Sequence, residues 1–414
     1  MIKYKRYERY KDSGVEWIGE IPEHWGVIKL KYVTKLAYGD SLPTENREEE
    51  GEVDVFGSNG KVGTHNVANT LSPVIIVGRK GSYGKVTYSD KKCFAIDTTY
   101  YIDNRCTKSN IKWLYYSLMV LELDKNSQDT GVPGLSREYA YNKYVPVPTV
   151  NEQVAIANFL DQKTAEIDDL IADKEKLIEL LQEKRQAIIT EAVTKGLNPN
   201  VRMKDSGIEW IGEIPEHWNL RRIRYLANIR NVKASDSDID KTYVGLENIE
   251  SKTGKLLTNG DDEQQFVGET ANIFKKGDVL FGKLRPYLAK CIIADFDGRC
   301  TSELLVLKTT SYILPKYLHF FMLSPKFIDV VNSSTYGAKM PRASWDFIGN
   351  LEIPLPSIKE QEDIVEYLTE FISRIDDLIS DINTQIQKLE EYRQSLISEA
   401  VTGKIDVRDY VVSN

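Results

Sequence analysis

Two glycine-rich turns in the first half of the chain carry side chains that could bind a polyanion. Gly78–Lys85 (GRKGSYGK) places basic and aromatic residues on a flexible segment, and Gly131–Arg137 (GVPGLSR) ends in a serine and an arginine. Basic groups pair with phosphates, and arginine can also bind a base edge through two hydrogen bonds. A second pair of turns, at Gly282–Arg285 and Gly337–Arg342, recurs at matching places in the second half.

The candidate DNA-contacting residues come from these turns and their immediate neighbours. They are Arg79, Lys80, Ser82, Tyr83, Lys85, Ser136 and Arg137 in the first half, and Lys283, Arg285, Tyr287, Lys290, Lys339, Arg342 and Ser344 in the second. For any one of them, a solvated surface role is an equally good interpretation. The recurrence of the pattern is what favours DNA contact.

Motifs of nucleotide chemistry are missing from the sequence. Gly78–Lys85 does not match G-x-x-x-x-G-K-[ST], because Val86 stands where a Ser or Thr would hold Mg²⁺. There is no G-x-G-x-x-G between a strand and a helix, and no Asn/Asp-Pro-Pro-aromatic tetrapeptide of the amino-methyltransferase type. We therefore expect no bound cofactor on this chain.

Catalytic and metal sites are equally unsupported. His24 and His217 occupy equivalent places in a repeat, and no Ser, Cys or carboxylate partner can be named for them, which favours a structural role. The four cysteines form no C-x-x-C pair and have no metal-ligand spacing with the histidines. This cysteine usage and the lack of an apolar N-terminal segment predict a reduced, cytoplasmic protein.

An internal duplication sets the architecture. Lys11–Trp25 (KDSGVEWIGEIPEHW) returns as Lys204–Trp218 with one Val/Ile difference, and we name both copies the tryptophan motif. Val145–Gln153 (VPVPTVNEQ) returns as Ile353–Gln361 (IPLPSIKEQ). The segments between these conserved pieces differ in sequence and length. The chain is thus a tandem repeat of tryptophan motif, variable region, Pro-x-Pro junction and long helix.

Each repeat ends in a predicted helix with a heptad pattern. In Glu152–Val193, Leu160, Ile167, Leu181 and Ile188 share one seven-residue row, and Leu170 and Leu177 lie three residues after members of that row. At 1.5 Å per residue, about 42 residues span roughly 63 Å. Lys163, Lys174 and Lys184 fall on this seam, so a continuously apolar seam is not expected. The second copy carries Leu368, Ile375, Ile382, Leu389 and Leu396.

The ends of these helices and the tryptophan motif carry local signals. Asn151 stands where an N-cap belongs, Gly196 and Pro199 close the first helix, and Gly403 closes the second. In the tryptophan motif, glycines and a proline shape turns, and Trp17 and Trp25 are expected to be buried anchors of a structural clasp.

The variable regions read as mixed α/β domains with short strands. Predicted strands are Val74–Val77, Thr98–Ile102, Val279–Phe281 and Leu304–Leu307, and predicted helices are Trp113–Leu123 and Pro315–Leu323. We predict an α+β fold with two such domains separated by two long helices packed as an antiparallel coiled coil, in a pseudo-twofold tandem repeat. The predicted boundaries are 1–150, 151–198, 199–358 and 359–414.

Charge is unevenly distributed. The net charge is −8, but the excess of acids lies on the predicted long helices, and the variable regions are mildly basic. This distribution permits a DNA-facing surface on the variable regions.

The repeated motifs give the chain a family resemblance. Trp17–Trp25 and Trp210–Trp218, the junctions Pro146–Gln153 and Pro354–Gln361, and the run Gly277–Arg285 resemble those of the specificity (S) subunit of a type I restriction–modification enzyme. The resemblance spans essentially the whole chain.

The resemblance implies two target-recognition domains, each reading half of a split, asymmetric DNA site, with the coiled coil setting the spacer. It also implies a non-catalytic chain. Modification (M) subunits would bring S-adenosylmethionine and adenine methylation, and restriction (R) subunits would bring ATP-driven translocation and cleavage. A specificity subunit of a related methylation or nuclease system, or a coiled-coil scaffold without DNA, remains the alternative.

Overall fold

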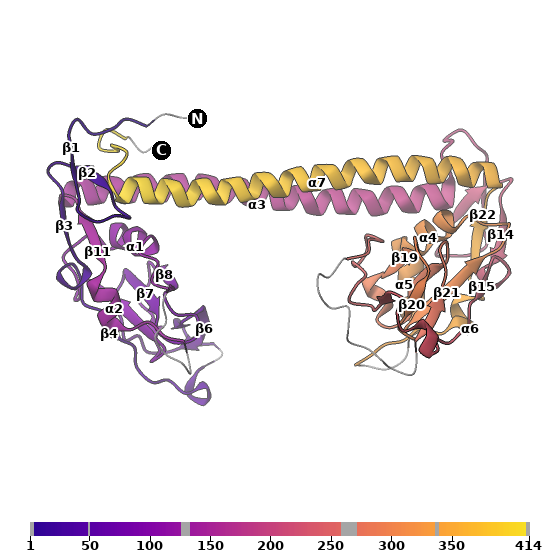
Figure 1. Ribbon diagram of the computed structural model, residues 1–414, viewed down its shortest axis with the longest axis horizontal. Helices are drawn as coiled ribbons and strands as arrows, with labels where there is room; N and C mark the ends of the chain where they lie inside the picture. Colours follow the sequence, from indigo (N-terminus) through magenta and orange to yellow (C-terminus); the bar gives the residue numbers. More distant parts are fainter. Residues whose placement is uncertain (1–3, 49, 126–132, 258–270, 336–338, 411–414) are drawn as a thin grey trace. The chain divides into compact units, whose positions relative to one another are not determined.

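The computed structural model describes residues 4–48, 50–125, 133–257, 271–335 and 339–410. The chain forms two compact units: unit 1 comprises residues 1–174 and 384–414, and unit 2 comprises residues 175–383. Each unit combines one variable region with a segment of each long helix (Figure 1). None of the described helices is both long enough and apolar enough to span a bilayer.

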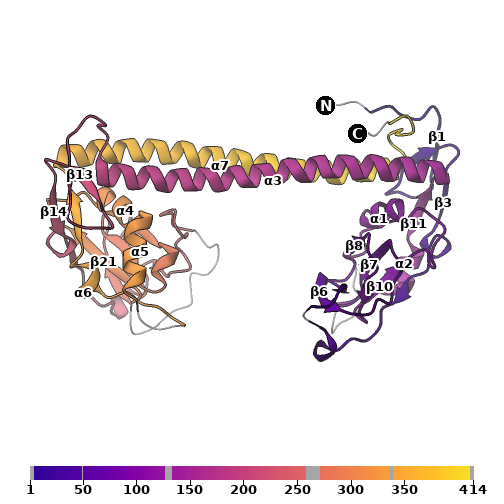
Figure 2. The same ribbon diagram turned by 180° about the vertical axis from the view of Figure 1, so that it is seen from behind.

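The two long helices are α3 (Val150–Lys195) and α7 (Ile358–Val401). They pack side by side in both views (Figures 1 and 2). In unit 1, Lys174 Nζ donates to Gln385 Oε1 at 2.6 Å, and Arg393 forms an ion pair with Asp168 at 3.0 Å. Asp168 contacts Arg393 and the later residue Lys174 contacts the earlier residue Gln385, so the two helices run antiparallel. The predicted antiparallel coiled coil is confirmed.

Both long helices begin with a capping box. Glu152 accepts from the backbone N–H and hydroxyl of Thr149, and Glu152 N–H donates back to Thr149 Oγ1. Ser357 and Glu360 make the same contacts at the start of α7. The prediction that Asn151 caps the first helix is wrong, because the helix already includes that residue. At the other end, Gly196 follows α3 with a φ of +75°.

The seam between the helices confirms one predicted row and corrects the other. Leu160 and Ile167 are buried, as predicted, but Leu170 and Leu177 are 50% and 45% exposed. The second row lies four residues after the first, not three, and contains the half-buried Ile171. For the same reason Arg185 lies in the seam and Lys184 is exposed. The second helix follows its prediction, with Leu368, Ile375, Ile382 and Leu396 buried and Leu389 half-buried.

Unit 1 holds a four-stranded sheet in the order β4-β10-β7-β8, a three-stranded sheet in the order β6-β5-β9, and the antiparallel pairs β1-β2 and β11-β3. Its strands are β1 (Tyr10–Asp12), β2 (Glu20–Pro22), β3 (Gly26–Lys29), β4 (Ala37–Tyr38), β5 (Val53–Gly57), β6 (Gly60–His65), β7 (Val74–Gly78), β8 (Val86–Ser89), β9 (Phe94–Ala95), β10 (Thr99–Ile102) and β11 (Tyr144–Val147). Its short helices are α1 (Ile111–Met119) and α2 (Arg137–Asn142). The predicted strands at β7 and β10 are confirmed.

Unit 2 repeats this plan with the sheets β15-β21-β18-β19 and β16-β20-β17 and the pairs β12-β13 and β14-β22. Its strands are β12 (Met203–Asp205), β13 (Glu213–Pro215), β14 (Asn219–Arg222), β15 (Ala227–Ile229), β16 (Tyr243–Val244), β17 (Asn272–Phe274), β18 (Val279–Gly282), β19 (Cys291–Ile293), β20 (Gly298–Cys300), β21 (Leu304–Thr309) and β22 (Glu352–Leu355). Its short helices are α4 (Pro315–Leu323), α5 (Pro325–Ser333) and α6 (Trp345–Ile348).

The Glu-Gln pair at the start of each long helix joins the helix to the rest of its unit. Glu152 Oε1 accepts from His24 Nε2 at 2.8 Å and from Trp25 Nε1 at 3.2 Å. Gln153 accepts from Asn110 N–H, just before α1, at 2.9 Å. Buried carboxylates need such donors, so the junction fixes both the tryptophan motif and the variable region to α3. The structural role predicted for His24 is confirmed, with Glu152 as its partner.

Unit 2 uses the same joint. Glu360 accepts from His217 and Trp218 at 2.7 and 3.1 Å, and Gln361 accepts from Leu314 N–H at 2.8 Å. In unit 1, Trp25 is buried as predicted, but Trp17 is 43% exposed, so Trp17 is not the expected core anchor.

Candidate nucleic-acid interface

The early and late turns of unit 1 form one surface. Leu135 N–H donates to Arg79 O at 2.8 Å, and Gly81 N–H donates to Pro133 O at 3.1 Å. Lys80 and Gly134 form the β-bridge between these bonds. The first part of the predicted late turn, Gly131 and Val132, lies outside the described residues. From Pro133 onward, backbone hydrogen bonds hold the two predicted segments together.

Unit 2 pairs its turns in the same register. Ala343 N–H donates to Lys283 O at 2.9 Å, and Arg285 N–H donates to Pro341 O at 2.8 Å. Leu284 bridges to Arg342 in the position that matches the bridge in unit 1. Gly337 and Ala338 of the predicted late turn lie outside the described residues. The sequence predicted four separate turns, and the structure combines them into two equivalent loop pairs.

Tyr38 is the centre of the loop pair in unit 1. The Arg79 guanidinium carbon lies 5.0 Å from the centre of the Tyr38 ring, and that of Arg137 lies 4.8 Å from it. Such stacking holds a guanidinium plane without using its N–H donors. Tyr38 is 46% exposed, so the cluster lies at the surface. Sequence reasoning missed Tyr38, which lies on β4, about 40 residues before Arg79 and outside any glycine-rich turn.

The two arginines differ in how many donors they keep free. Arg79 Nη1 donates to Asp97 O at 2.8 Å, which fixes its direction. The Arg137 guanidinium makes no hydrogen bond or ion pair to another side chain or backbone group within the described part of the chain, and it also lies 5.9 Å from the centre of the Tyr141 ring. A stacked guanidinium whose N–H groups are free can donate two hydrogen bonds to a guanine edge or to a phosphate.

Unit 2 presents different side chains on the same backbone frame. Arg342 donates to both carboxylate oxygens of Glu303 at 3.2 and 3.0 Å. Arg285 is exposed and has a φ of +51°, where Gly81 has a φ of +75° in unit 1. A left-handed arginine is unfavourable, so its position depends on the surrounding bonds. Tyr287 is 46% exposed beside it.

Several predicted contact residues have partners within the protein. Ser136 and Ser344 are N-caps whose hydroxyls accept from the backbone N–H groups of Tyr139 and Phe347. Lys85 Nζ donates to Asn59 O at 2.9 Å, and Lys290 Nζ donates to Leu246 O at 2.6 Å. These four side chains hold the loops in place and have fewer donors left for a ligand.

The other predicted residues lie on the loops with varying exposure. Lys80, Ser82 and Lys339 are exposed, Lys283 is half-buried, and Tyr83 packs against the core of unit 1. Their contact with DNA stays a prediction.

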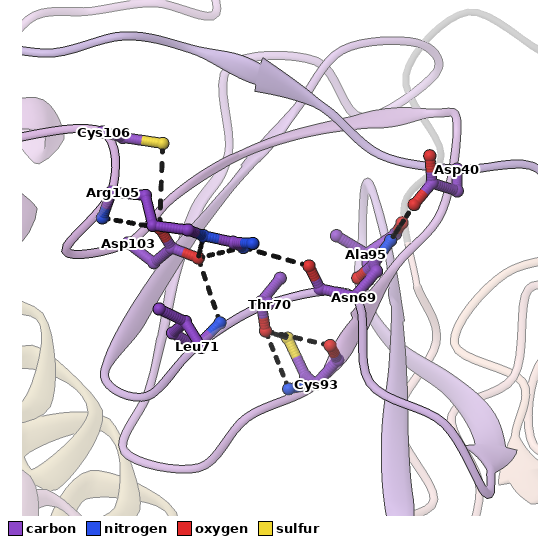
Figure 3. Close-up of polar contacts among 9 residues, drawn as sticks. All are labelled: Asp40, Asn69, Thr70, Leu71, Cys93, Ala95, Asp103, Arg105 and Cys106. Atoms are coloured by element: carbon purple, nitrogen blue, oxygen red, sulfur yellow. Dashed lines mark hydrogen bonds and ion pairs between the residues drawn. The ribbon is translucent and has the colours of Figure 1, made fainter.

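A buried acid anchors the loop that precedes β7 (Figure 3). Asp103 is fully buried and accepts from Leu71 N–H at 3.0 Å and from the Arg105 guanidinium at 2.5 Å. Burial raises the pKa of Asp103, but the bonds from Arg105 and Leu71 outweigh it and lower the pKa overall. Arg105 also donates to Asn69 O at 3.1 Å, and Asn69 bonds Asp40 and Ala95. The network fixes Arg105 at the surface of unit 1.

No group of three or more metal-binding side chains comes together in the described ranges. The surface features are therefore cationic and aromatic side chains on paired loops.

Comparison with known proteins identifies the repeated domain. A family model described as the type I restriction modification DNA specificity domain matches the chain twice, at residues 22–180 and 215–388. The specificity subunit of the type I restriction enzyme EcoDI of Escherichia coli is 24% identical over 94% of this chain and 90% of its own length. The specificity subunit of the type I restriction enzyme MjaVIII of Methanocaldococcus jannaschii is 22% identical over 94% of this chain and 95% of its own length.

A solved structure supports the fold. A chain from a study of complex assembly and conformational transition of the type I R-M system superposes with a TM-score of 0.67. It covers 92% of this chain and 98% of its own length at 13% identity. Because the family model matches well over half of the sequence, this chain belongs to the family of type I restriction–modification DNA specificity domains, of which it carries two copies.

Proposed function

We propose that this chain is the DNA sequence-recognition subunit of a type I restriction–modification complex. Each unit reads one half of a bipartite site through its loop pair, and the coiled coil of α3 and α7 sets the spacer. The observation that carries the proposal is the matching register of the two loop pairs, Arg79–Gly81 with Pro133–Leu135 and Lys283–Arg285 with Pro341–Ala343. The same frame presents unlike side chains.

The recognised site is asymmetric because the two readers differ. Unit 1 presents Arg79 and Arg137 stacked on Tyr38. Counted from the tryptophan motif, Asn231 stands where Tyr38 stands, and unit 2 presents an Arg342–Glu303 pair instead. Arginine suits guanine, and a carboxylate accepts from cytosine N4, so different chemistry reads different bases.

The proposed partners are double-stranded DNA, modification subunits and restriction subunits. S-adenosylmethionine and ATP with Mg²⁺ bind the modification and restriction subunits. This chain positions those subunits on the DNA and does not itself turn over a substrate. The assembly works where chromosomal and invading DNA are found, in the cytoplasm.

Quantitative DNA binding by the full chain together with its modification subunit tests this proposal. A duplex carrying the recognised site should bind at least 10³-fold more tightly than a scrambled duplex at physiological salt, as specific DNA-binding proteins do. Equal affinity for both duplexes would contradict sequence recognition. Binding that does not weaken as salt rises would favour a scaffold without a DNA partner.

A further inference from the structure

A basic groove on unit 1 lies next to the cluster of Tyr38, Arg79 and Arg137. Its volume is about 770 Å³, and its lining includes Lys31, Lys35, Arg105 and Lys108. No aspartate or glutamate is among the described residues that line it. A concave surface with cations and no acid concentrates positive potential.

The four cations fall into two classes. Arg105 is held by the buried Asp103, as Figure 3 shows, so its charge is largely balanced and it forms a fixed wall. Lys31, Lys35 and Lys108 are exposed, and within the described residues they form no ion pair. Burial raises the pKa of the Cys106 thiol between them, so no thiolate offsets their charge. Three lysine charges are available to a ligand.

The groove is continuous with the cluster of Tyr38, Arg79 and Arg137. Tyr141 lines the groove, and its hydroxyl accepts from Leu36 N–H at 3.0 Å. The same ring lies 5.9 Å from the Arg137 guanidinium carbon. Leu36 connects Lys35 in the groove to β4, which carries Tyr38 of the cluster. An extended polyanion that contacts Arg137 can therefore continue into the groove.

We infer that this groove binds the phosphodiester backbone of the DNA beside the half-site read by unit 1. Lys31, Lys35 and Lys108 neutralise phosphates, and Arg105 shapes the wall. Lysine contacts of this kind position a duplex without reading its sequence. The inference rests on the proposed function and adds a phosphate-binding surface to it.

Unit 2 differs at the matching positions. Counted from the tryptophan motif, Arg224 matches Lys31 and Asn228 matches Lys35. The Arg224 guanidinium donates to Asp346 O at 3.5 Å. The groove is therefore expected to make the backbone contacts of unit 1 stronger than those of unit 2.

Salt-dependent binding of a random-sequence duplex to the full chain tests the inference. Each phosphate contact contributes about 0.9 to the slope of log K against log salt, so the triple variant Lys31→Gln, Lys35→Gln, Lys108→Gln should lose about 2.7 from that slope. Lys61→Gln removes a charge that pairs with Asp54 outside the groove and is the matched control. Lys35→Arg, which keeps the charge, should keep the slope.

The outcomes separate this inference from the proposed function. A reduced slope with an unchanged recognised motif supports the groove as a backbone contact. A slope equal to that of Lys61→Gln overturns it, even if specific recognition persists. Loss of modification-subunit binding with an unchanged DNA slope also overturns it and assigns the groove to a protein partner. Far-ultraviolet circular dichroism confirms that each variant is folded.

Discussion

Arg185 Nη1 lies 3.1 Å from Asp376 Oδ1 across the seam between α3 and α7. Arg393 and Asp168, the residues 208 positions away, form the same pair in unit 1 at 3.0 Å. In unit 2 the pair also holds the variable region, because Arg185 donates to Thr253 O at 2.8 Å and Asp376 pairs with Lys255 at 2.8 Å. These polar pairs in the seam define which segments of the helices lie together.

Replacing Arg185 with leucine should destabilise unit 2. The side chain of Arg185 is 6% exposed, so its loss leaves Asp376 with Lys255 alone. Removing one member of a buried pair costs about 3–5 kcal/mol, and the partial exposure of Asp376 reduces this to about 1–3 kcal/mol. The urea midpoint of the full chain measures the change. The control Arg374→Gln, which breaks an exposed pair with Glu370, should cost no more than about 0.5 kcal/mol.

The double variant Arg185→Leu, Asp376→Leu separates packing from charge. It should recover much of the stability lost by Arg185→Leu, because no charge is left unpaired in the seam. A double variant that is less stable than the single one would show that the pair itself stabilises the fold.

The hydrogen bonds that Glu360 accepts should make the stability of unit 2 sensitive to acid. Burial raises the pKa of Glu360, but hydrogen bonds from His217, Ser357 and Trp218 outweigh it and lower the pKa to about 2. A carboxyl with a lowered folded pKa stabilises the fold above its unfolded pKa of about 4.5, and this contribution is lost as the pH falls toward 2. Glu360→Gln should therefore lower stability at pH 7 and flatten its loss between about pH 5 and pH 2.

Thermal unfolding from pH 7 to pH 3 checks this prediction. The control Glu362→Gln changes an exposed carboxylate two residues further along α7, which pairs with Lys359 at 4.0 Å. It should keep the pH dependence of the unsubstituted chain. If the thermal stability of both variants depended on pH in the same way, the hydrogen-bonded Glu360 would not be the source of the acid sensitivity.

The arginines stacked on Tyr38 should determine specificity in one half-site. Arg137→Ala should weaken binding to the recognised duplex by about 1–3 kcal/mol and relax the base preference at one or two positions. Tyr38→Leu should cause a smaller loss of the same kind, because both guanidinium groups keep their charge but lose the Tyr38 ring that they share. Competition among duplexes with single base changes measures both effects.

Lys61→Gln is the control for these variants, because it removes a charge in the same unit outside the loop pair. If Arg137→Ala lowered affinity equally for every sequence, Arg137 would contact phosphate alone. The half-site read by unit 2 should be unchanged in every case.

A four-residue insertion in both long helices should lengthen the spacer. Placed after Lys174 and after Asn383, it adds about 6 Å and rotates the helix by about 40°. One base pair advances DNA by about 3.4 Å and rotates it by about 34–36°. The added length corresponds to about two base pairs and the added rotation to about one, so we expect the spacer to lengthen by one or two base pairs with both half-sites unchanged. An insertion in α3 alone should instead misalign the seam and destabilise the chain.

The sequence predicted the parts of the fold that repeat. The duplication, the long helices, and strands such as the predicted Val74–Val77, observed as Val74–Gly78, follow from spacing and hydrophobic runs, which act locally. The details that failed depend on pairing. Leu170 is exposed and Ile171 lies in the seam, because packing against the partner helix decides which row of side chains is buried. Thr149, rather than Asn151, caps α3, in a capping box with Glu152.

The candidate site was predictable by region and not by role. Glycine-rich turns marked the loops, but Ser136 and Ser344 are N-caps because short helices begin there. Tyr38 and Glu303 reach the loop pairs from other strands or loops, and no local pattern predicts such contacts between distant residues. The matching backbone register of the two units likewise appears only when the chain is folded.

Genome-wide mapping of adenine methylation, with and without this chain, tests the central claim most directly. With the chain and its modification subunit present, we predict one methylated motif that has two different half-sites separated by a fixed unspecified spacer. That motif should disappear when the chain is removed. An unchanged methylation pattern after removal, or a dependent motif that is continuous or palindromic, would contradict the account.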